Sequence, residues 1–143
     1  MYPELMIIPM REELRRIGVV ELRTSSEVDE LLSRKTGTTM VVVNSICGCA
    51  AGRMRPAVRM ALEHTVRPDT IASVFAGQDR DATERARSYF SGYPPSSPSI
   101  GLFRDGELVY FLERHDIENR DAEDIAADLT ASFDKFCTKA TAR

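Results

Sequence analysis

The stretch Thr39–Gly52, TMVVVNSICGCAAG, joins a run of apolar, mostly β-branched residues to two cysteines separated by a single glycine. The run Met40–Val43 is short and wholly apolar, as is typical of a strand buried on both faces. After the cysteines, apolar residues recur at helical spacing at Met54, Ala57, Val58, Ala61 and Leu62. The sequence therefore predicts that Cys47 and Cys49 lie where a central strand turns into a helix.

This position favours chemistry on a sulfur atom. The first N–H groups of a helix have no partner within the helix, and thiols placed there have pKa values lowered from about 8.5 to roughly 3.5–7.5. Arg53 and Arg55 would add positive potential unless they point into water. Because Cys47 comes first and lies nearer the exposed turn, we expect it to be the nucleophile and Cys49 to be the resolving thiol.

Gly48 lacks a Cβ atom, and this makes a small Cys47–Cys49 disulfide ring feasible. Such a ring would be strained and exposed, which suits exchange better than permanent cross-linking. Two alternatives are inert buried thiols and a metal site. Within one chain the remaining soft donors are His64, His115 and Cys137, and none has paired spacing, so we expect no metal. A metal or cluster shared by the thiolates of a dimer stays open as an alternative.

Composition narrows the classes of function. The chain has 143 residues, 43% hydrophobic and 29% charged, with a net charge of −3, which fits one soluble domain over residues 1–143. The charge offers no general attraction to nucleic acid or to an anionic membrane. The N-terminal MYPELMIIPM has no basic region and is broken by prolines, so neither a signal peptide nor a membrane span is expected. A cytoplasmic location is the default expectation.

The remaining segments predict alternating strands and helices. Before the central strand we expect a helix over 10–17 opened by Pro9, a strand over 19–23, and a helix from Ser26 with Asp29 at its capping-box position. After the cysteines and their helix we expect a strand over 70–76 and a helix capped by Asp79 or Asp81. Strands over 100–103 and 108–112, joined by Asp105-Gly106, and a helix from about Asp121 complete the chain. Pro56 predicts a kink or a late start of the helix after the cysteines. Residues 1–18 are expected to form an N-terminal extension. Within it, Met1–Ile8 covers the domain or, as the less favoured alternative, takes part in a homodimer contact. Residues 138–143 are expected to be a frayed tail.

This order, with a cysteine pair after the central strand, resembles the thioredoxin fold: a mixed sheet of about five strands flanked by helices, here with an extra N-terminal helix. The thioredoxin motif is C-x-x-C, however, and one residue is missing between these cysteines. Four segments are similar to the bacilliredoxin family, whose signature is C-G-C: NSICGCAAG, FAGQDRDAT, SPSIGLFRDGELVYFLERHDIE and FDKFC.

The resemblance implies thiol–disulfide exchange. Members of the family remove bacillithiol, a low-molecular-weight thiol, from mixed disulfides on proteins, and some act as disulfide isomerases. On this chain Cys47 would take the bacillithiol and Cys49 or a second thiol would release it. Bacillithiol is then a co-substrate, and no cofactor is required. A general disulfide isomerase or reductase that does not use bacillithiol is the alternative within enzymes.

The resemblance also implies substrate-binding positions. Thioredoxin-like folds carry a cis-proline loop opposite the first cysteine, and Ser97-Pro98 occupies that place, so we expect a cis bond there with backbone available to a substrate strand. Gln78 is a further candidate. His115 should lie at the thiol end of the sheet, where it would move a proton or serve as an ordinary loop residue. The buried acid and the tryptophan of thioredoxins have no counterpart, and Cys137 is expected to be a packed thiol far from the site.

Overall fold

The strand β2 (Thr38–Asn44) lies in the middle of the sheet. It pairs in parallel with β3 (Thr70–Phe75) and antiparallel with β4 (Ser99–Arg104). The computed structural model describes residues 2–137, so the expected tail 138–143 lies outside the described residues. Because β2 has a strand on each side and helices over both faces, its residues are almost completely buried, as the apolar run predicts.

The sheet has five strands in the order β1-β3-β2-β4-β5, with β1 (Val20–Glu21) and β5 (Glu107–Leu112) at its edges. β4 and β5 form an antiparallel hairpin, which places β5 parallel to β2. The helical segments are α1 (Glu4–Arg15), α2 (Ser25–Leu32), η1 (Ala50–Met54), α3 (Arg55–Ala61), α4 (Arg80–Ser88), α5 (Arg114–Ile117) and α6 (Ala122–Phe136). The predicted mixed sheet with flanking helices and an N-terminal helix is confirmed.

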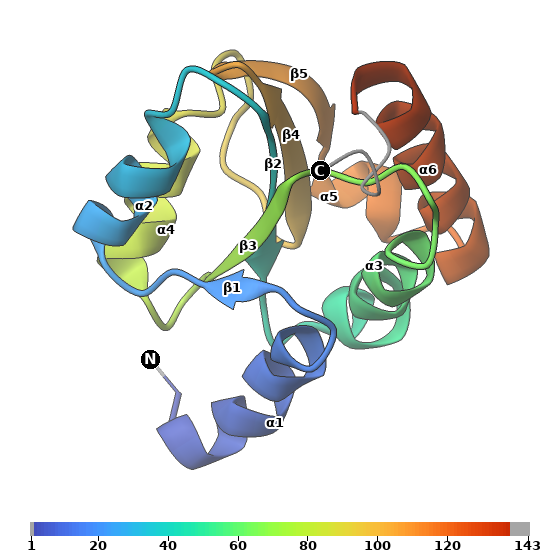
Figure 1. The fold of residues 1–143 in the computed structure, drawn as a ribbon. Helices are drawn as coiled ribbons and strands as arrows, with labels where there is room; N and C mark the ends of the chain where they lie inside the picture. Colours follow the sequence, from blue (N-terminus) through green and yellow to red (C-terminus); the bar gives the residue numbers. More distant parts are fainter. Residues whose placement is uncertain (1, 138–143) are drawn as a thin grey trace.

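Helices cover both faces of the sheet (Figure 1): α2 and α4 lie on one side, and α3 and α6 lie on the other. Successive side chains of β2 point to opposite faces of the sheet and so contribute to both layers. Met40 and Val42 join the core under α3 and α6, whereas Val41 and Val43 join the core under α2 and α4. The carboxyl end of β2 is thereby held rigidly between two packed layers.

The N-terminal helix α1 begins six residues earlier than expected, and Pro9 lies inside it rather than at its start. Pro9 donates no hydrogen bond to the carbonyl of Leu5, but both residues are exposed, so water can hydrate that carbonyl. Ile7, Arg11 and Leu14 form the buried face. The preferred interpretation of Met1–Ile8 as a cover therefore holds for Ile7.

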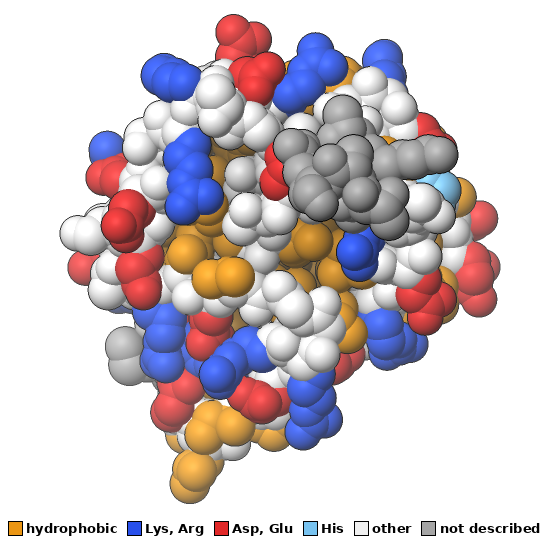
Figure 2. Space-filling view, viewed as in Figure 1, with side chains coloured by type: hydrophobic (Ala, Val, Ile, Leu, Met, Phe, Trp, Pro, Cys, Tyr) orange, Lys and Arg blue, Asp and Glu red, His pale blue; other side chains and the backbone are white. Residues whose placement is uncertain are grey.

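The other apolar side chains of this segment are exposed. Tyr2, Leu5, Met6 and Ile8 remain 40%, 84%, 46% and 43% accessible. Hydrophobic atoms gather over α1 at the bottom of the space-filling view (Figure 2). Among the described residues, no helix combines the length and the apolar character needed to cross a membrane.

One predicted helix cap is wrong, and a second is right in its position but not in its hydrogen bond. The capping box of α2 is formed by Thr24 and Glu27, not by Ser26 and Asp29, and it fits the pattern Thr-x-x-Glu. Asp79 does occupy the N-cap position of α4, but its side chain makes no capping bond. Both of its carboxylate oxygens bind Arg11 of α1, at 2.6 and 3.0 Å, because this long-range ion pair competes successfully with the local cap.

The predicted irregularity near Pro56 is present as a turn of π-helix, η1, between the cysteines and α3. Pro56 directly follows this π-helical turn and is the second residue of α3. The Asp105-Gly106 turn has positive φ at both residues, 52° and 87°, as the hairpin prediction requires. The short helix α5, directly after β5, was not predicted.

Candidate active site

The two cysteines lie where β2 leads into the helix. The backbone is already helical at Gly48 and Cys49, and the carbonyl of Cys47 accepts hydrogen bonds from the N–H groups of Ala50 and Ala51 at 3.0 and 3.2 Å. Cys47 therefore sits at the N-cap of this helical segment. Both cysteines are free thiols and partly accessible to solvent.

The pKa of Cys47 is lowered from the ordinary thiol value. Burial acts to raise it, but the backbone N–H of Ala50, the hydroxyl of Ser45 and the neighbouring Cys49 donate hydrogen bonds to the sulfur and outweigh burial. The Ser45 hydroxyl also accepts the N–H of Cys47 at 3.3 Å, so this side chain is held against the turn. The direction agrees with the thiolate expected at a helix N-terminus.

The pKa of Cys49 is shifted in the opposite direction. Burial raises it first, and the hydrogen bond to Cys47 and the negative charge on that sulfur raise it further. Cys47 is thus the thiol that ionises first, with Cys49 as a hydrogen-bond donor beside it. This order of ionisation suits the predicted roles of nucleophile and resolving thiol.

The positive charge near the sulfurs comes from Arg114, the first residue of α5. Its charge lowers the pKa of Cys49, and its own pKa is raised, first by its hydrogen bond to Glu118 and then by the charge of Cys47. Nε of Arg114 binds Glu118 at 2.9 Å and Nη1 donates to the carbonyl of Ser97 at 3.2 Å. No sequence pattern pointed to this arginine, because only the sheet brings α5 to the C-G-C turn.

The two arginines expected to supply this charge are engaged elsewhere. Arg55 is buried, and it binds Glu13 through Nε at 2.9 Å and Asn44 Oδ1 through Nη1 at 2.8 Å. Arg53 donates to the carbonyl of Arg120 at 2.6 Å. Neither points freely into water, and Arg55 instead supports the turn from beneath.

The peptide bond between Ser97 and Pro98 is cis, which confirms the prediction. Ser97 and Cys47 line the same open pocket of about 330 Å³. The full lining consists of Tyr2, Ser45, Ile46, Cys47, Ala76, Gly77, Arg87, Ser97 and Arg114. The cis-proline loop and the leading thiol therefore face one shared cavity.

Gln78 and His115 do not line this pocket. The Gln78 amide instead binds the N-terminal segment, accepting from the N–H of Tyr2 at 3.0 Å and donating to its carbonyl at 2.9 Å. Its predicted role in substrate binding gains no support from this geometry. His115 is at the expected end of the sheet, but its side chain is 70% exposed, and its neighbour Arg114 is the residue that approaches the sulfurs.

One group of metal-type donors is present near this end of the sheet. Ligand atoms of Glu113, His115 and Asp116 lie within 4.8 Å of one another. The two carboxylates already form the capping box of α5, which accounts for their closeness without a metal. The predicted absence of a metal or cofactor stays a prediction.

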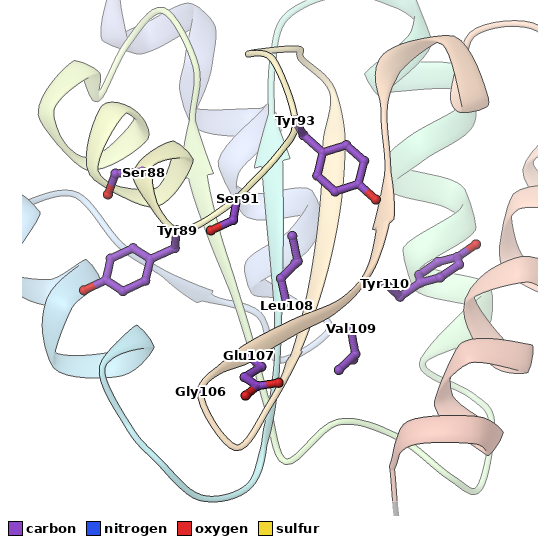
Figure 3. A pocket seen from close by; sticks show the side chains of 9 residues that line it. All are labelled: Ser88, Tyr89, Ser91, Tyr93, Gly106, Glu107, Leu108, Val109 and Tyr110. Carbon is purple, nitrogen blue, oxygen red and sulfur yellow. The ribbon is translucent and has the colours of Figure 1, made fainter.

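A larger cavity, of about 570 Å³, lies away from the cysteines (Figure 3). It is bounded by the end of α4, by Tyr93, and by the β4–β5 turn with the strand that follows. Arg104, the residue before that turn, pairs with Thr38 at the start of β2, at the end opposite Cys47. Size therefore does not mark the reactive site in this molecule.

Cys137 lies at the far end of the sheet. It packs against the core, and burial raises the pKa of its thiol to about 11, although a hydrogen bond with Thr38 lowers it in part. Thr38 is the first residue of β2, whereas the C-G-C turn follows the last. The prediction of a packed thiol remote from the site is confirmed.

Comparison with known proteins gives consistent results. The sequence profile of the disulphide isomerase family matches residues 2–137. A bacilliredoxin of Koribacter versatilis is 58% identical over 96% of this chain and 94% of its own length. Those of Salinibacter ruber and Geobacillus kaustophilus are 53% and 50% identical over 95% of this chain and over 81% and 94% of their own lengths.

Solved structures establish the fold. A thioredoxin of Schistosoma mansoni superposes with a TM-score of 0.56 at 20% identity, over 84% of this chain and 96% of its own. A thioredoxin of Fasciola hepatica does so with 0.56 at 17% identity, over 82% and 99%. The described chain has a thioredoxin-like fold.

Proposed function

The chain belongs to the disulphide isomerase family and is a thiol–disulfide oxidoreductase, and on that premise we propose that it removes bacillithiol from protein mixed disulfides through Cys47. The observation that carries this proposal is the pair of opposite pKa shifts at the helix N-cap, lowered at Cys47 and raised at Cys49. Bacillithiol is proposed as the co-substrate because relatives of this chain carry the name bacilliredoxin.

In the first step, the Cys47 thiolate attacks the bacillithiol sulfur of the mixed disulfide. A Cys47–bacillithiol disulfide forms, the S–S bond between bacillithiol and the substrate protein's cysteine breaks, and that cysteine leaves as a thiolate that takes a proton from water. In the second step, Cys49 loses its proton and attacks Cys47, which releases bacillithiol and leaves a Cys47–Cys49 disulfide. Alternatively, a second low-molecular-weight thiol attacks the bacillithiol sulfur of the adduct. Cys47 is then released as a thiolate, and the two small thiols leave joined in a disulfide.

The raised pKa of Cys49 does not block the second step. Burial contributes to the shift in both states, but the hydrogen bond and the charge of Cys47 contribute only while Cys47 is a thiolate. Once Cys47 is in a neutral disulfide, both contributions vanish and the nearby Arg114 continues to favour the Cys49 thiolate. Adduct formation therefore activates the resolving thiol.

The proposal is tested by trapping the first intermediate. A Cys49→Ala protein is mixed with a bacillithiolated substrate and analysed by intact mass and peptide mapping. We expect the mass of one bacillithiol on Cys47. A Cys137→Ala variant should behave as the wild type, and an adduct found only on Cys137 would contradict the assignment.

A general disulfide isomerase or reductase is the alternative within enzymes, and transfer of glutathione and bacillithiol at equal rates would favour it. A dimer that holds a metal or cluster through the C-G-C thiolates is the alternative of another class. It predicts stoichiometric metal in protein purified without chelator and loss of that metal in Cys47→Ser. The exposed apolar residues of α1 are where we propose a homodimer contact would form, and the cytoplasm remains the proposed location.

A further inference from the structure

Two arginines from distant parts of the chain line the pocket beside Cys47. Arg87 lies in the last turn of α4, and Arg114 is the first residue of α5. The nine residues that line the pocket include these two arginines and neither Asp nor Glu, although the chain as a whole carries a net charge of −3. The lining therefore presents two guanidinium groups and no carboxylate, with Glu118 paired to Arg114 from outside the pocket.

Arg87 is short of partners. Its Nε atom is buried and makes no hydrogen bond, and its Nη2 makes a long one, 3.4 Å, to the carbonyl of Ser96. Within residues 2–137 no carboxylate lies within ion-pair distance of it. A guanidinium that makes one long hydrogen bond and no ion pair keeps N–H donors for an anion that enters the pocket.

Arg114 is held in a fixed orientation. Its bonds to Glu118 and to the Ser97 carbonyl use Nε and Nη1, and Nη2 is left for another acceptor. A guanidinium matches the two oxygens of a carboxylate in geometry and charge. With Arg87 lining the same cavity, a small molecule whose sulfur reaches Cys47 can also present a carboxylate to the pair.

We propose that Arg87 and Arg114 form a carboxylate-binding subsite beside Cys47, and that this subsite selects low-molecular-weight thiols that carry carboxylate groups. The inference rests on the proposed function, since it concerns the thiol that Cys47 takes from a mixed disulfide. We assign the carboxylate to the small thiol and not to the protein substrate, because the cavity of about 330 Å³ has the size of a small-molecule site and Cys47 lies in its wall.

The test uses two mixed disulfides of one fluorescent peptide, one with mercaptosuccinate and one with its uncharged diamide. Each enzymatic kcat/KM is divided by the rate of uncatalysed exchange with mercaptoethanol, which removes intrinsic differences in reactivity. The wild type should prefer the carboxylate form by about tenfold, the scale of one charge-assisted hydrogen bond. The preference should fall as salt is added, because exposed charges are screened.

Arg87→Gln and Arg114→Gln should each reduce this preference to about threefold or less. The readout is the ratio, since Arg114→Gln also changes the reactivity of the thiols toward both probes. Arg59→Gln, on the exposed face of α3, removes the same charge outside the pocket and should leave the ratio unchanged.

A wild-type ratio near one would overturn the inference and requires no variant. A ratio that both pocket variants preserve would also overturn it. So would a preference that depends on whether Asp or Asn stands beside the peptide cysteine, and not on the charge of the small thiol. Exchange with neither probe would contradict the proposed function itself, so the two failures are distinguishable.

Discussion

Asn44, the last residue of β2, accepts a hydrogen bond on Oδ1 from Nη1 of Arg55, the first residue of α3, at 2.8 Å. The same guanidinium nitrogen donates to the carbonyl of Ser45 at 3.0 Å. The N–H of Ser45 in turn donates to Asn44 Oδ1 at 2.9 Å. Asn44, Ser45 and Arg55 are all almost completely buried. A polar network thus joins the strand end to the helix start beneath the C-G-C turn and fixes the direction in which Cys47 leaves the sheet.

Replacing Arg55 by Met should lower the free energy of unfolding by about 2–4 kcal/mol, because the buried Asn44 and Ser45 oxygens lose a charged donor. Urea denaturation of the reduced protein measures the change. Arg59→Met, an exposed substitution on the same helix, should stay within about 0.5 kcal/mol of the wild type. An Arg55→Met protein as stable as that control would mean that the network contributes little.

Replacing Ser45 by Ala should raise the pKa of Cys47, because the thiolate loses the hydroxyl that donates to it while the Ala50 N–H remains. The pH dependence of alkylation by iodoacetamide, with the label located on Cys47, gives this pKa. Ser97→Ala, in the pocket wall opposite, is the matched control and should leave the value unchanged. An unchanged pKa in Ser45→Ala would show that the Ser45 hydroxyl contributes little to stabilising the thiolate.

Stability should depend on pH through Cys47. Its folded-state pKa lies below the unfolded value of about 8.5, so the thiolate contributes stability that is fully present above about 8.5 and is lost as the pH falls through the folded value. Relative to Cys47→Ser, the reduced wild type should therefore gain free energy of unfolding as the pH rises toward 8.5.

The other two thiols give the opposite sign at higher pH. The pKa of Cys137 is raised to about 11, so its contribution is present below the unfolded value and is lost as the pH rises through about 11. Cys49 is shifted in the same direction. Denaturation curves below pH 8.5 thus isolate Cys47, and a difference from Cys47→Ser that stays constant or shrinks with rising pH would contradict the lowered pKa.

Replacing Arg11 by Met should lower the free energy of unfolding by about 3–5 kcal/mol, because the buried Asp79 carboxylate loses both of its short bonds to a guanidinium and keeps only Arg23 at 3.6 Å. Arg11 binds Asp79 through two nitrogens and also binds Glu4 at 2.9 Å and Glu21 at 2.8 Å. The double variant Arg11→Met/Asp79→Asn should recover part of the loss, since the buried side chain at position 79 is then no longer charged. Denaturant unfolding of the single and double variants measures both, and a double variant less stable than Arg11→Met would exclude this explanation.

Local patterns predicted the elements that depend on local physics. The buried strand before the cysteines and the Asp105-Gly106 hairpin are present, and the apolar spacing from Met54 to Leu62 marks a buried helix face. The cis bond at Pro98 is present too, but the family resemblance predicted it and no local pattern did. The predictions failed where a distant partner competed with a local one. Asp79 was expected to cap its own helix, and Arg11, 68 residues away, takes its carboxylate.

The sequence by itself determined that two glycine-spaced cysteines stand at the start of a helix after a buried strand, because strand burial, helix periodicity and helix-end electrostatics act over a few neighbouring residues. Only the tertiary structure decided what surrounds the leading sulfur. Arg87 and Arg114 come from two elements that meet Cys47 through the order of strands in the sheet, and the buried Arg55 turns inward to Asn44. These contacts join different elements of the fold, and no local pattern carries that information.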